Sequence, residues 1–350
     1  MRVAIEAASL TLTSGGLARY TSELSLALAR SFPADEFILI SDQAFRMPDA
    51  APANLTRGAG PRNAIERRWW LWGIAREMAR LRADLVHGPD FAVPYLARRP
   101  SVMTLHDLSP WMDERWHHAA QRVKRRTPVI LDLGIATMIV TPTERVRKQA
   151  IERFHLRPER VIAVAEAAPS WMKPVPAVPG RPYFLFVGTL EPRKNLPALL
   201  DAWRAVRRHH EIDLVLAGRR RTDFPVLPPE SGLQLLGEVP DADLPRLYSA
   251  ALAFVYPSLY EGFGLPVLEA MQCGACVIAS SAVREVGGNA AVYADSAEEL
   301  AEAMRAAAQS AAWTDPWRAR SLARAAEFSW DRTARETYQV YQEARRRFGK

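Results

Sequence analysis

Two glutamates flank a glycine-rich turn in the sequence SLYEGFGLPVLEA, residues 258–270. Glu261 precedes Gly262, Phe263 and Gly264, and Glu269 lies in an apolar helical pattern that begins near Leu265. The free N–H groups and the positive dipole end of such a helix bind anions such as phosphate. Because carboxylates repel phosphate, Glu261 and Glu269 are expected to hold hydroxyl groups of the same ligand, on either side of its anionic part.

Arg193 and Lys194 in the motif EPRKN form a second chemical group. When a bond to a nucleoside diphosphate breaks, negative charge grows on the diphosphate, and two adjacent cations stabilise it. The alternative for this pair is a solvated basic surface. His106, near the end of the strand-like run SVMTLHD, is a third candidate, and a packing role is its alternative.

The elements that position these residues are strand-like runs that alternate with helical patterns. The runs are RVAIEA, EFILIS, DLVHG, SVMTLHD and MIVTP in the first half and YFLFVG, DLVLAG, LQLLG, AFVYPS and ACVIAS in the second. This alternation predicts an α/β protein of two doubly wound domains in tandem. Ligands of such folds bind at the carboxyl ends of the strands, so we expect the site in the cleft between the domains.

A proline-rich segment separates the two halves. Its prolines exclude a helix or a central strand and predict a linker over residues 169–182. We therefore expect an amino-terminal domain over residues 1–168 and a carboxyl-terminal domain over residues 183–328. Residues 329–350 are expected to form a helix that packs back towards the first domain.

Composition excludes several classes of protein. No apolar run approaches the roughly 20 residues that span a bilayer, and the start of the chain is unlike a signal peptide, which predicts a soluble cytoplasmic protein. Cys273 and Cys276 supply neither a disulfide framework nor a four-ligand zinc site, and their CGAC motif closes a helical pattern, whereas a thiol redox pair opens one. In DAD, residues 241–243, Asp241 or Asp243 is interpreted as a helix N-cap rather than a metal ligand.

The net charge of +7 originates in the first half of the chain. Residues 51–126 hold 14 basic and 7 acidic residues. Such a basic region can bind nucleic acid, an anionic membrane or an acidic substrate, or it can be only a solvated surface. We expect peripheral association with the inner face of the membrane. The side chains expected to take part are Arg122, Lys124, Arg125 and Arg126, interleaved with Trp69, Trp70, Trp72, Trp111 and Trp116. For RRWWLW, residues 67–72, acceptor recognition and core packing are the alternatives.

Taken together, these motifs resemble family 4 of the retaining, nucleotide-sugar-dependent glycosyltransferases, and most closely its bacterial mannosyltransferase-type branch. The resemblance rests on FVGTLEPRKNLPALLDAW and YPSLYEGFGLPVLEAMQCGACVIAS, and SGGLARYTSEL, TLHDLSP and FSWDRTARETYQVYQEA extend it over nearly the whole chain. The family implies a GT-B fold, in which two Rossmann-like domains face each other across a cleft. Many relatives have arginine where this chain has Thr189, so Thr189 is not assigned to the phosphate site.

The resemblance implies a role for each candidate residue. Glu269 would hold the ribose and Glu261 the donor sugar. His106 would contact the donor sugar, and Asp241 would bind the guanine edge. Arg193 and Lys194 would stabilise the leaving group. The residues that would bind the diphosphate are Gly15 and Gly16 in the first half and, together with the sugar, Gly262, Phe263, Gly264 and Leu265 in the second. A plain turn is the alternative for the glycine pair.

The reaction that the resemblance implies is hexose transfer, with mannose from GDP-mannose as the expected donor. A hydroxyl of a glycan or lipid-linked acceptor would receive the sugar with retention of configuration and without a metal or other cofactor, in cell-surface glycan or glycolipid assembly. In the family, the leaving phosphate itself helps to deprotonate the acceptor in a front-face displacement. The alternatives are a nucleotide-sugar epimerase on the same fold and a basic nucleic-acid-binding protein, and neither has support comparable to the paired motifs.

Overall fold

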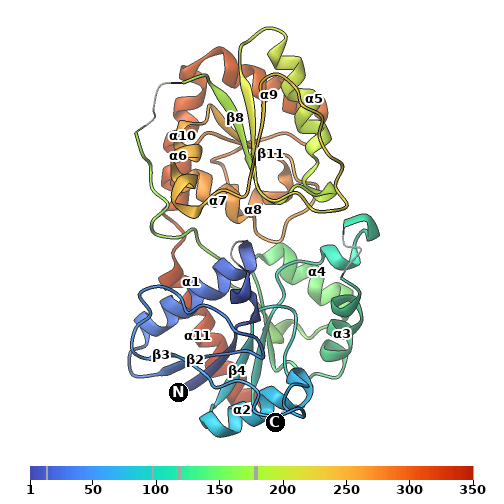
Figure 1. Ribbon diagram of the computed structural model, residues 1–350, viewed down its shortest axis with the longest axis vertical. Coiled ribbons are helices and arrows are strands. Elements are labelled where there is room, and N and C mark those ends of the chain that lie inside the picture. Colours follow the sequence, from blue (N-terminus) through green and yellow to red (C-terminus); the bar gives the residue numbers. More distant parts are fainter. Residues whose placement is uncertain (13–14, 97, 117–119, 177–179, 350) are drawn as a thin grey trace. The chain divides into compact units, whose positions relative to one another are not determined.

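The computed structural model describes residues 1–12, 15–96, 98–116, 120–176 and 180–349, which form two α/β units (Figure 1). Unit 1 comprises Met1–Glu166 and Ser329–Lys350, and unit 2 comprises Ala167–Phe328. The segment predicted as a linker falls in unit 2, and residues 177–179 of it lie outside the described residues. Within the described ranges, no helix combines the length and the apolar character needed to cross a bilayer.

In its described residues, unit 1 is built on a seven-stranded parallel sheet of order β3-β2-β1-β4-β5-β6-β7. The strand order reverses between β1 and β4, as in doubly wound folds. The strands are β1 (Arg2–Glu6), β2 (Glu36–Ile40), β3 (Leu55–Arg57), β4 (Leu85–Gly88), β5 (Ser101–Thr104), β6 (Met138–Thr141) and β7 (Val161–Ala163). The helices are α1 (Gly16–Ser31), α2 (Ile74–Leu81), α3 (Gln121–Asp132), α4 (Glu144–Phe154) and α11 (Trp330–Arg347).

The carboxyl-terminal helix α11 is part of the core of unit 1. It packs against α1, and its Tyr338 stacks on Phe32, the residue after α1, with the ring centroids 3.7 Å apart. The hydroxyl of Tyr341 lies 2.7 Å from Nδ1 of His87, a fully buried residue of β4. Burial lowers the pKa of His87 to about 3, so its imidazole is neutral. This buried contact ties the end of the chain to the first sheet.

Unit 2 repeats the arrangement with a six-stranded parallel sheet in its described residues, of order β10-β9-β8-β11-β12-β13. The order reverses between β8 and β11. The strands are β8 (Tyr183–Val187), β9 (Asp213–Ala217), β10 (Leu233–Gly237), β11 (Ala253–Tyr256), β12 (Val277–Ala279) and β13 (Val292–Tyr293). The helices, which cover both sides of this sheet in Figure 1, are α5 (Leu196–Arg207), α6 (Leu244–Ala250), α7 (Leu265–Gln272), α8 (Arg284–Gly287), α9 (Ala297–Gln309) and α10 (Ala311–Ala325).

The predicted α/β fold class is confirmed, and each predicted strand-like run contains a strand. Three strands were missed: β3, β7 and β13. All three lie at sheet edges and span two or three residues. Central strands of a parallel sheet are buried on both faces and therefore stand out as apolar runs, whereas such short edge strands carry no periodic signal.

Candidate active site

Two loops of unit 2 meet where the strand order of its sheet reverses. One follows β8 and passes through a 3₁₀ turn (Pro192–Lys194) into α5, and the other follows β11 and leads into α7. Because β8 and β11 are hydrogen-bonded neighbours, the residues beyond their carboxyl ends come together. The backbone N–H of Leu259 donates to the carbonyl of Arg193 at 2.9 Å. In doubly wound folds this reversal point is where ligands bind.

Glu261 is the centre of a buried cluster of charges in these loops. Its Oε1 accepts a hydrogen bond from Lys194 Nζ at 2.5 Å, and its Oε2 accepts one from Arg193 Nη1 at 2.9 Å. Lys194 Nζ also donates to the hydroxyl of Tyr256 at 2.7 Å. The structure thus brings together three predicted site residues from two separate motifs, through hydrogen bonds strengthened by charge.

Glu191, which the sequence analysis did not single out, holds Arg193 from the other side. Arg193 Nη2 donates to Glu191 Oε1 at 2.8 Å, and Arg221 Nη1 donates to Glu191 Oε2 at 3.1 Å. The guanidinium of Arg193 is therefore fixed between two carboxylates. The sequence gives one signal for this role, which is the position of Glu191 as the first residue of the EPRKN motif.

The Glu261 carboxyl is ionised in these surroundings. Burial alone would raise its pKa, but the charges of Arg193 and Lys194 outweigh burial and lower the pKa to about 2. Burial lowers the pKa of Lys194. Its nitrogen nevertheless donates to two oxygens at once, and the ammonium is the form that fits this geometry. Lys194 and Glu261 therefore form an ion pair, and both Lys194 and Arg193 lie beside the glycine turn that follows Glu261.

The turn between the two glutamates requires glycine at Gly264. Its φ of +103° lies in the left-handed region, and a Cβ there would lie 2.7 Å from Cγ1 of Val283. Gly264 takes the N-cap position of α7, which begins at Leu265 as predicted. The N–H groups predicted to meet the diphosphate, those of Phe263, Gly264 and Leu265, therefore lie at the positive end of a helix.

Glu269 lies within α7, where its side chain is almost fully buried. Its Oε2 accepts a hydrogen bond from the hydroxyl of Tyr248 in α6 at 3.0 Å. The sequence analysis missed Tyr248, because a tyrosine in an amphipathic helix reads as a packing residue. The hydroxyl orients the carboxylate that was predicted to hold the ribose.

Two other predictions for unit 2 concern helix ends. Asp241 and Asp243 are exposed residues of a 3₁₀ turn before α6, and Asp243 takes the N-cap position of α6 as predicted, although its side chain makes no cap hydrogen bond. Cys273 follows the last residue of α7 and Cys276 directly precedes β12, as expected. Burial raises the pKa of both thiols to about 12.

In unit 1, Gly15 and Gly16 lie at the start of α1. Gly15 is the N-cap residue, with φ of +113° and ψ of 162°, a conformation that side chains disfavour. A Cβ at Gly15 would meet nothing within 4 Å. The glycine is therefore needed for the backbone conformation and leaves open space beside it.

His106 lies two residues beyond β5, and both of its ring nitrogens have partners within unit 1. Nε2 lies 2.7 Å from the carbonyl oxygen of Pro89, and Nδ1 lies 3.2 Å from Oε1 of Glu166. A carbonyl only accepts, so Nε2 carries a proton, and a second proton on Nδ1 matches the carboxylate. Burial lowers the pKa of His106, but the hydrogen bond and charge of Glu166 outweigh this effect and raise it. These contacts therefore favour the imidazolium more than water would.

The tryptophan cluster of unit 1 divides between core and surface. Trp69 to Gly73 form a π-helical turn, and Trp69 is buried against residues of β1, β2 and α2. Trp70 is half-buried beneath the guanidinium of Arg126, which lies 5.0 Å from its ring centroid, and Trp72 is 37% exposed. Core packing, one of the open alternatives, is thus the role of Trp69.

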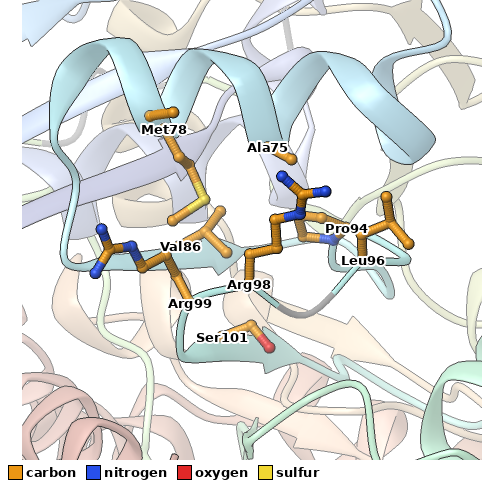
Figure 2. Close-up of a pocket in the computed structure, with 9 residues that line it drawn as sticks. Ala75, Met78, Val86, Pro94, Leu96, Arg98, Arg99 and Ser101 are labelled. Carbon is orange, nitrogen blue, oxygen red and sulfur yellow. The ribbon is translucent and has the colours of Figure 1, made fainter.

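A hollow of about 290 Å³ in unit 1 contains none of the predicted site residues. Figure 2 shows the side chains of Arg98 and Arg99 beside apolar groups such as Met78. The hollow lies over the amino-terminal part of β4 and β5, where Val86 and Ser101 line it. Ligands of doubly wound folds bind at the opposite, carboxyl edge, so this hollow is not the active site.

Comparison with known proteins agrees with the geometry of both units. Residues 14–166 match Glycosyltransferase Family 4, and residues 181–310 match Glycosyl transferases group 1. The O-antigen chain mannosyltransferase B of Escherichia coli is 34% identical over 283 residues, which cover 73% of this chain and 74% of that protein.

Two solved structures share the fold. WaaG, a glycosyltransferase involved in lipopolysaccharide biosynthesis, has a TM-score of 0.71 at 16% identity, with 100% of both chains covered. Anabaena Alr3699/HepE in complex with UDP-glucose has a TM-score of 0.72 at 18% identity, with 98% of this chain and 100% of that chain covered. The chain therefore has the GT-B fold and is a hexosyltransferase that belongs to glycosyltransferase family 4.

Proposed function

We propose that this enzyme transfers mannose from GDP-mannose to a hydroxyl group of a glycan acceptor, with retention of configuration, in the assembly of a cell-surface glycan. The buried cluster of Arg193, Lys194 and Glu261 is the observation that carries this proposal. It combines two fixed cations, suited to a diphosphate, with an ionised carboxylate, suited to sugar hydroxyls. The choice of mannose is supported by the O-antigen mannosyltransferase of Escherichia coli.

In the proposed reaction, the bond between C1 of mannose and the β-phosphate oxygen breaks while the acceptor oxygen bonds to C1 from the same face. The acceptor proton passes to the leaving phosphate oxygen, so no protein base is required. Arg193 and Lys194 stabilise the negative charge that grows on the diphosphate. We propose that the reaction is independent of a metal, because these fixed cations neutralise the charge of the leaving diphosphate.

The other predicted residues complete the donor site of this proposal. Glu269, oriented by Tyr248, binds the ribose hydroxyls. Each carboxylate oxygen can accept more than one hydrogen bond, so Glu261 keeps its ion pairs and also accepts hydroxyl groups of the donor sugar. The diphosphate is bound by Gly15, Gly16, Gly262, Phe263, Gly264 and Leu265, the sugar also by His106, and the guanine edge by Asp241.

Calorimetry with GDP and assays with GDP-mannose test these roles. Glu269→Gln should weaken the binding of free GDP about tenfold, because a ribose hydroxyl loses its charged acceptor. Glu261→Gln should leave GDP affinity within about twofold and suppress turnover, because the sugar is the only part of the donor that Glu261 is proposed to contact. Equal losses of GDP affinity in both variants would contradict the assignment.

The donor and the stereochemistry are tested with the wild-type enzyme. GDP should bind more tightly than UDP, and tighter binding of UDP would overturn the choice of nucleotide. Product analysis by NMR should show an α-mannosidic bond, as in the donor. Formation of a new sugar nucleotide without any acceptor would instead identify an epimerase.

Peripheral membrane association is also part of the proposal, and helix α3 is its support. The helix carries Arg122 and Arg125 as exposed cations, and Val129 on the helix and Leu133 directly after its last residue are 52% and 70% exposed. Basic and apolar groups on one exposed helix suit an anionic membrane surface. Arg126 differs from the other predicted cations because it covers Trp70.

Co-sedimentation with liposomes tests this association. Binding should need anionic lipid, fall as salt rises, and weaken when Arg122 and Arg125 become glutamine. Arg204→Gln and Arg207→Gln in unit 2 provide a control with the same change in charge. Indifference to lipid charge would remove the membrane from the proposal.

A further inference from the structure

Arg221 belongs to none of the motifs identified in the sequence, yet it reaches the charged cluster of the active site from the loop that follows β9. Its Nη1 donates to Oε2 of Glu191 at 3.1 Å, and its Nε donates to Oδ1 of Asp223 at 2.5 Å. Glu191 in turn holds the guanidinium of Arg193. Arg221 is therefore linked to Arg193 through a shared carboxylate.

The backbone brings Arg221 to this position. The loops that follow β8 and β9 continue the parallel pairing of the two strands, with Leu190 opposite Arg220. The N–H of Leu190 donates to the carbonyl of Arg219 at 2.9 Å, and the N–H of Arg221 donates to the carbonyl of Leu190 at 3.1 Å. This pairing places Arg221 beside Glu191.

Two local features of the loop after β9 support the same position. Gly218 has a φ of +138°, and a Cβ there would lie 2.0 Å from the carbonyl oxygen of Gly188, so only glycine lets the two chains approach this closely. The N–H of Phe224 donates to the carbonyl of Arg221 at 3.0 Å, and the Phe224 side chain is buried. Backbone pairing and packing thus position Arg221 independently of its ion pairs.

Glu191 divides its two oxygens between two guanidinium groups. Its Oε1 accepts from Nε and Nη2 of Arg193 at 3.2 and 2.8 Å, and its Oε2 accepts from Arg221. The Glu191 side chain is 9% exposed, so water screens its charge poorly. Burial lowers the pKa of Lys194, whereas the charge of Glu191 raises it. The negative charge of Glu191 therefore acts on both cations that are proposed to bind the diphosphate.

The balance of charge in the cluster depends on Arg221. The two cations of the EPRKN motif face two buried carboxylates, those of Glu191 and Glu261. Without another cation these charges would cancel, and a diphosphate would compete with both carboxylates. Arg221 supplies a further positive charge on the far side of Glu191. Its second partner, Asp223, has a side chain that is 35% exposed, so water screens that charge more effectively.

We propose that Arg221 is a positioning residue of the transferase reaction. It neutralises Glu191, so that this carboxylate can fix the guanidinium of Arg193 without withdrawing its positive charge from the leaving diphosphate. The proposal rests on the role proposed above for Arg193 and Lys194. The effect is largest for the fully charged leaving group, because negative charge on the diphosphate grows as the bond to the sugar breaks.

Calorimetry with inorganic pyrophosphate tests this role without reference to the nucleotide or the sugar. Arg221→Gln should weaken the binding of pyrophosphate about tenfold, because Glu191 then competes with the ligand for Arg193. Arg221→Lys keeps the positive charge and should lose less affinity than Arg221→Gln.

A double variant distinguishes neutralisation of Glu191 from a merely structural role. When Glu191→Gln is added to Arg221→Gln, the affinity for pyrophosphate should return to within about threefold of the wild-type value, since no charge is left to neutralise. The amide of the new side chain keeps an oxygen that can accept from Arg193. If Arg221 only stabilised the loop, the second substitution would not restore binding.

Turnover gives a second readout with the same order of variants. With the nucleotide sugar that the wild-type enzyme uses, Arg221→Gln should lower kcat about tenfold, and the double variant should recover most of it. Arg204→Gln is a matched control in unit 2, because Arg204 also binds one glutamate and one aspartate, Glu230 at 2.7 Å and Asp201 at 3.2 Å. It should change neither kcat nor the affinity for pyrophosphate.

The outcomes separate this proposal from the proposed function. Unchanged pyrophosphate affinity in Arg221→Gln, or a double variant as weak as the single one, overturns the role of Arg221 and leaves the proposed function intact. A wild-type enzyme that does not bind pyrophosphate would contradict both proposals. If another nucleotide sugar replaces GDP-mannose as the donor, the proposed function fails, while restored affinity in the double variant still supports the role of Arg221.

Discussion

The buried carboxyl group of Glu6 leads to a prediction about how the stability of unit 1 depends on pH. Its carboxyl group has a pKa raised from 4.5 to about 8, chiefly by burial. A raised carboxyl pKa means that the folded protein binds more protons than the unfolded chain between these two values, so the stability falls as pH rises from 4.5 to 8. Each unit of pKa shift corresponds to about 1.36 kcal/mol, which gives a total loss of about 5 kcal/mol.

Glu6→Gln removes this loss, because the amide stays neutral and keeps an oxygen for the Ala8 N–H. Relative to the wild type, the variant should gain about 4 kcal/mol in free energy of unfolding between pH 5 and pH 8. Urea unfolding at several pH values measures the difference. Because the two units can unfold in separate steps, the comparison uses the step that contains unit 1.

Glu77→Gln is a matched control with the opposite expectation. Glu77 is 1% exposed, but its carboxylate accepts from the N–H of Ala59 at 2.7 Å and from Nε of Arg80 at 2.9 Å. Its replacement should destabilise unit 1 by about 1–3 kcal/mol at every pH from 5 to 8. A stability difference between Glu6→Gln and wild type that stays constant over this range would refute the reasoning for Glu6.

Three further predictions follow from individual contacts. Glu166→Gln should lower the pKa of His106, measured by NMR titration of the imidazole, because the carboxylate no longer stabilises the imidazolium; an unchanged pKa would contradict this assignment. Gly264→Ala should destabilise unit 2 by about 1–3 kcal/mol in urea unfolding, since it strains the turn, and wild-type stability would be the contrary result. Cys273 and Cys276 should react with a disulfide reagent far more slowly in the folded protein than in urea, and equal rates would count against their raised pKa values.

The sequence by itself determined the fold class and the local features of the donor site. Strands such as β8 and β11 are buried on both faces, so their apolar runs identify them without knowledge of their neighbours. The glycine turn and the start of α7 at Leu265 were also predictable, because left-handed conformation and helix initiation depend on residues close together in the sequence.

Only the tertiary structure decided which side chains support these features. The adjacency of β8 and β11 places Arg193 and Lys194 against Glu261, and it makes Glu191 and Tyr256 part of the same cluster. Apart from the position of Glu191 in the EPRKN motif, no pattern in the sequence marks such partners, because the contacts join separate elements.

Glu6 illustrates the same limit. In the sequence it is one polar residue at the end of a strand, and a solvated carboxylate is the ordinary expectation. The structure buries it beside Trp69 and near Arg126, from two other elements, without a hydrogen-bond partner for Oε1 among the described residues. Burial and charge at one atom depend on everything packed around it, and therefore on the whole sheet and its helices rather than on the local sequence.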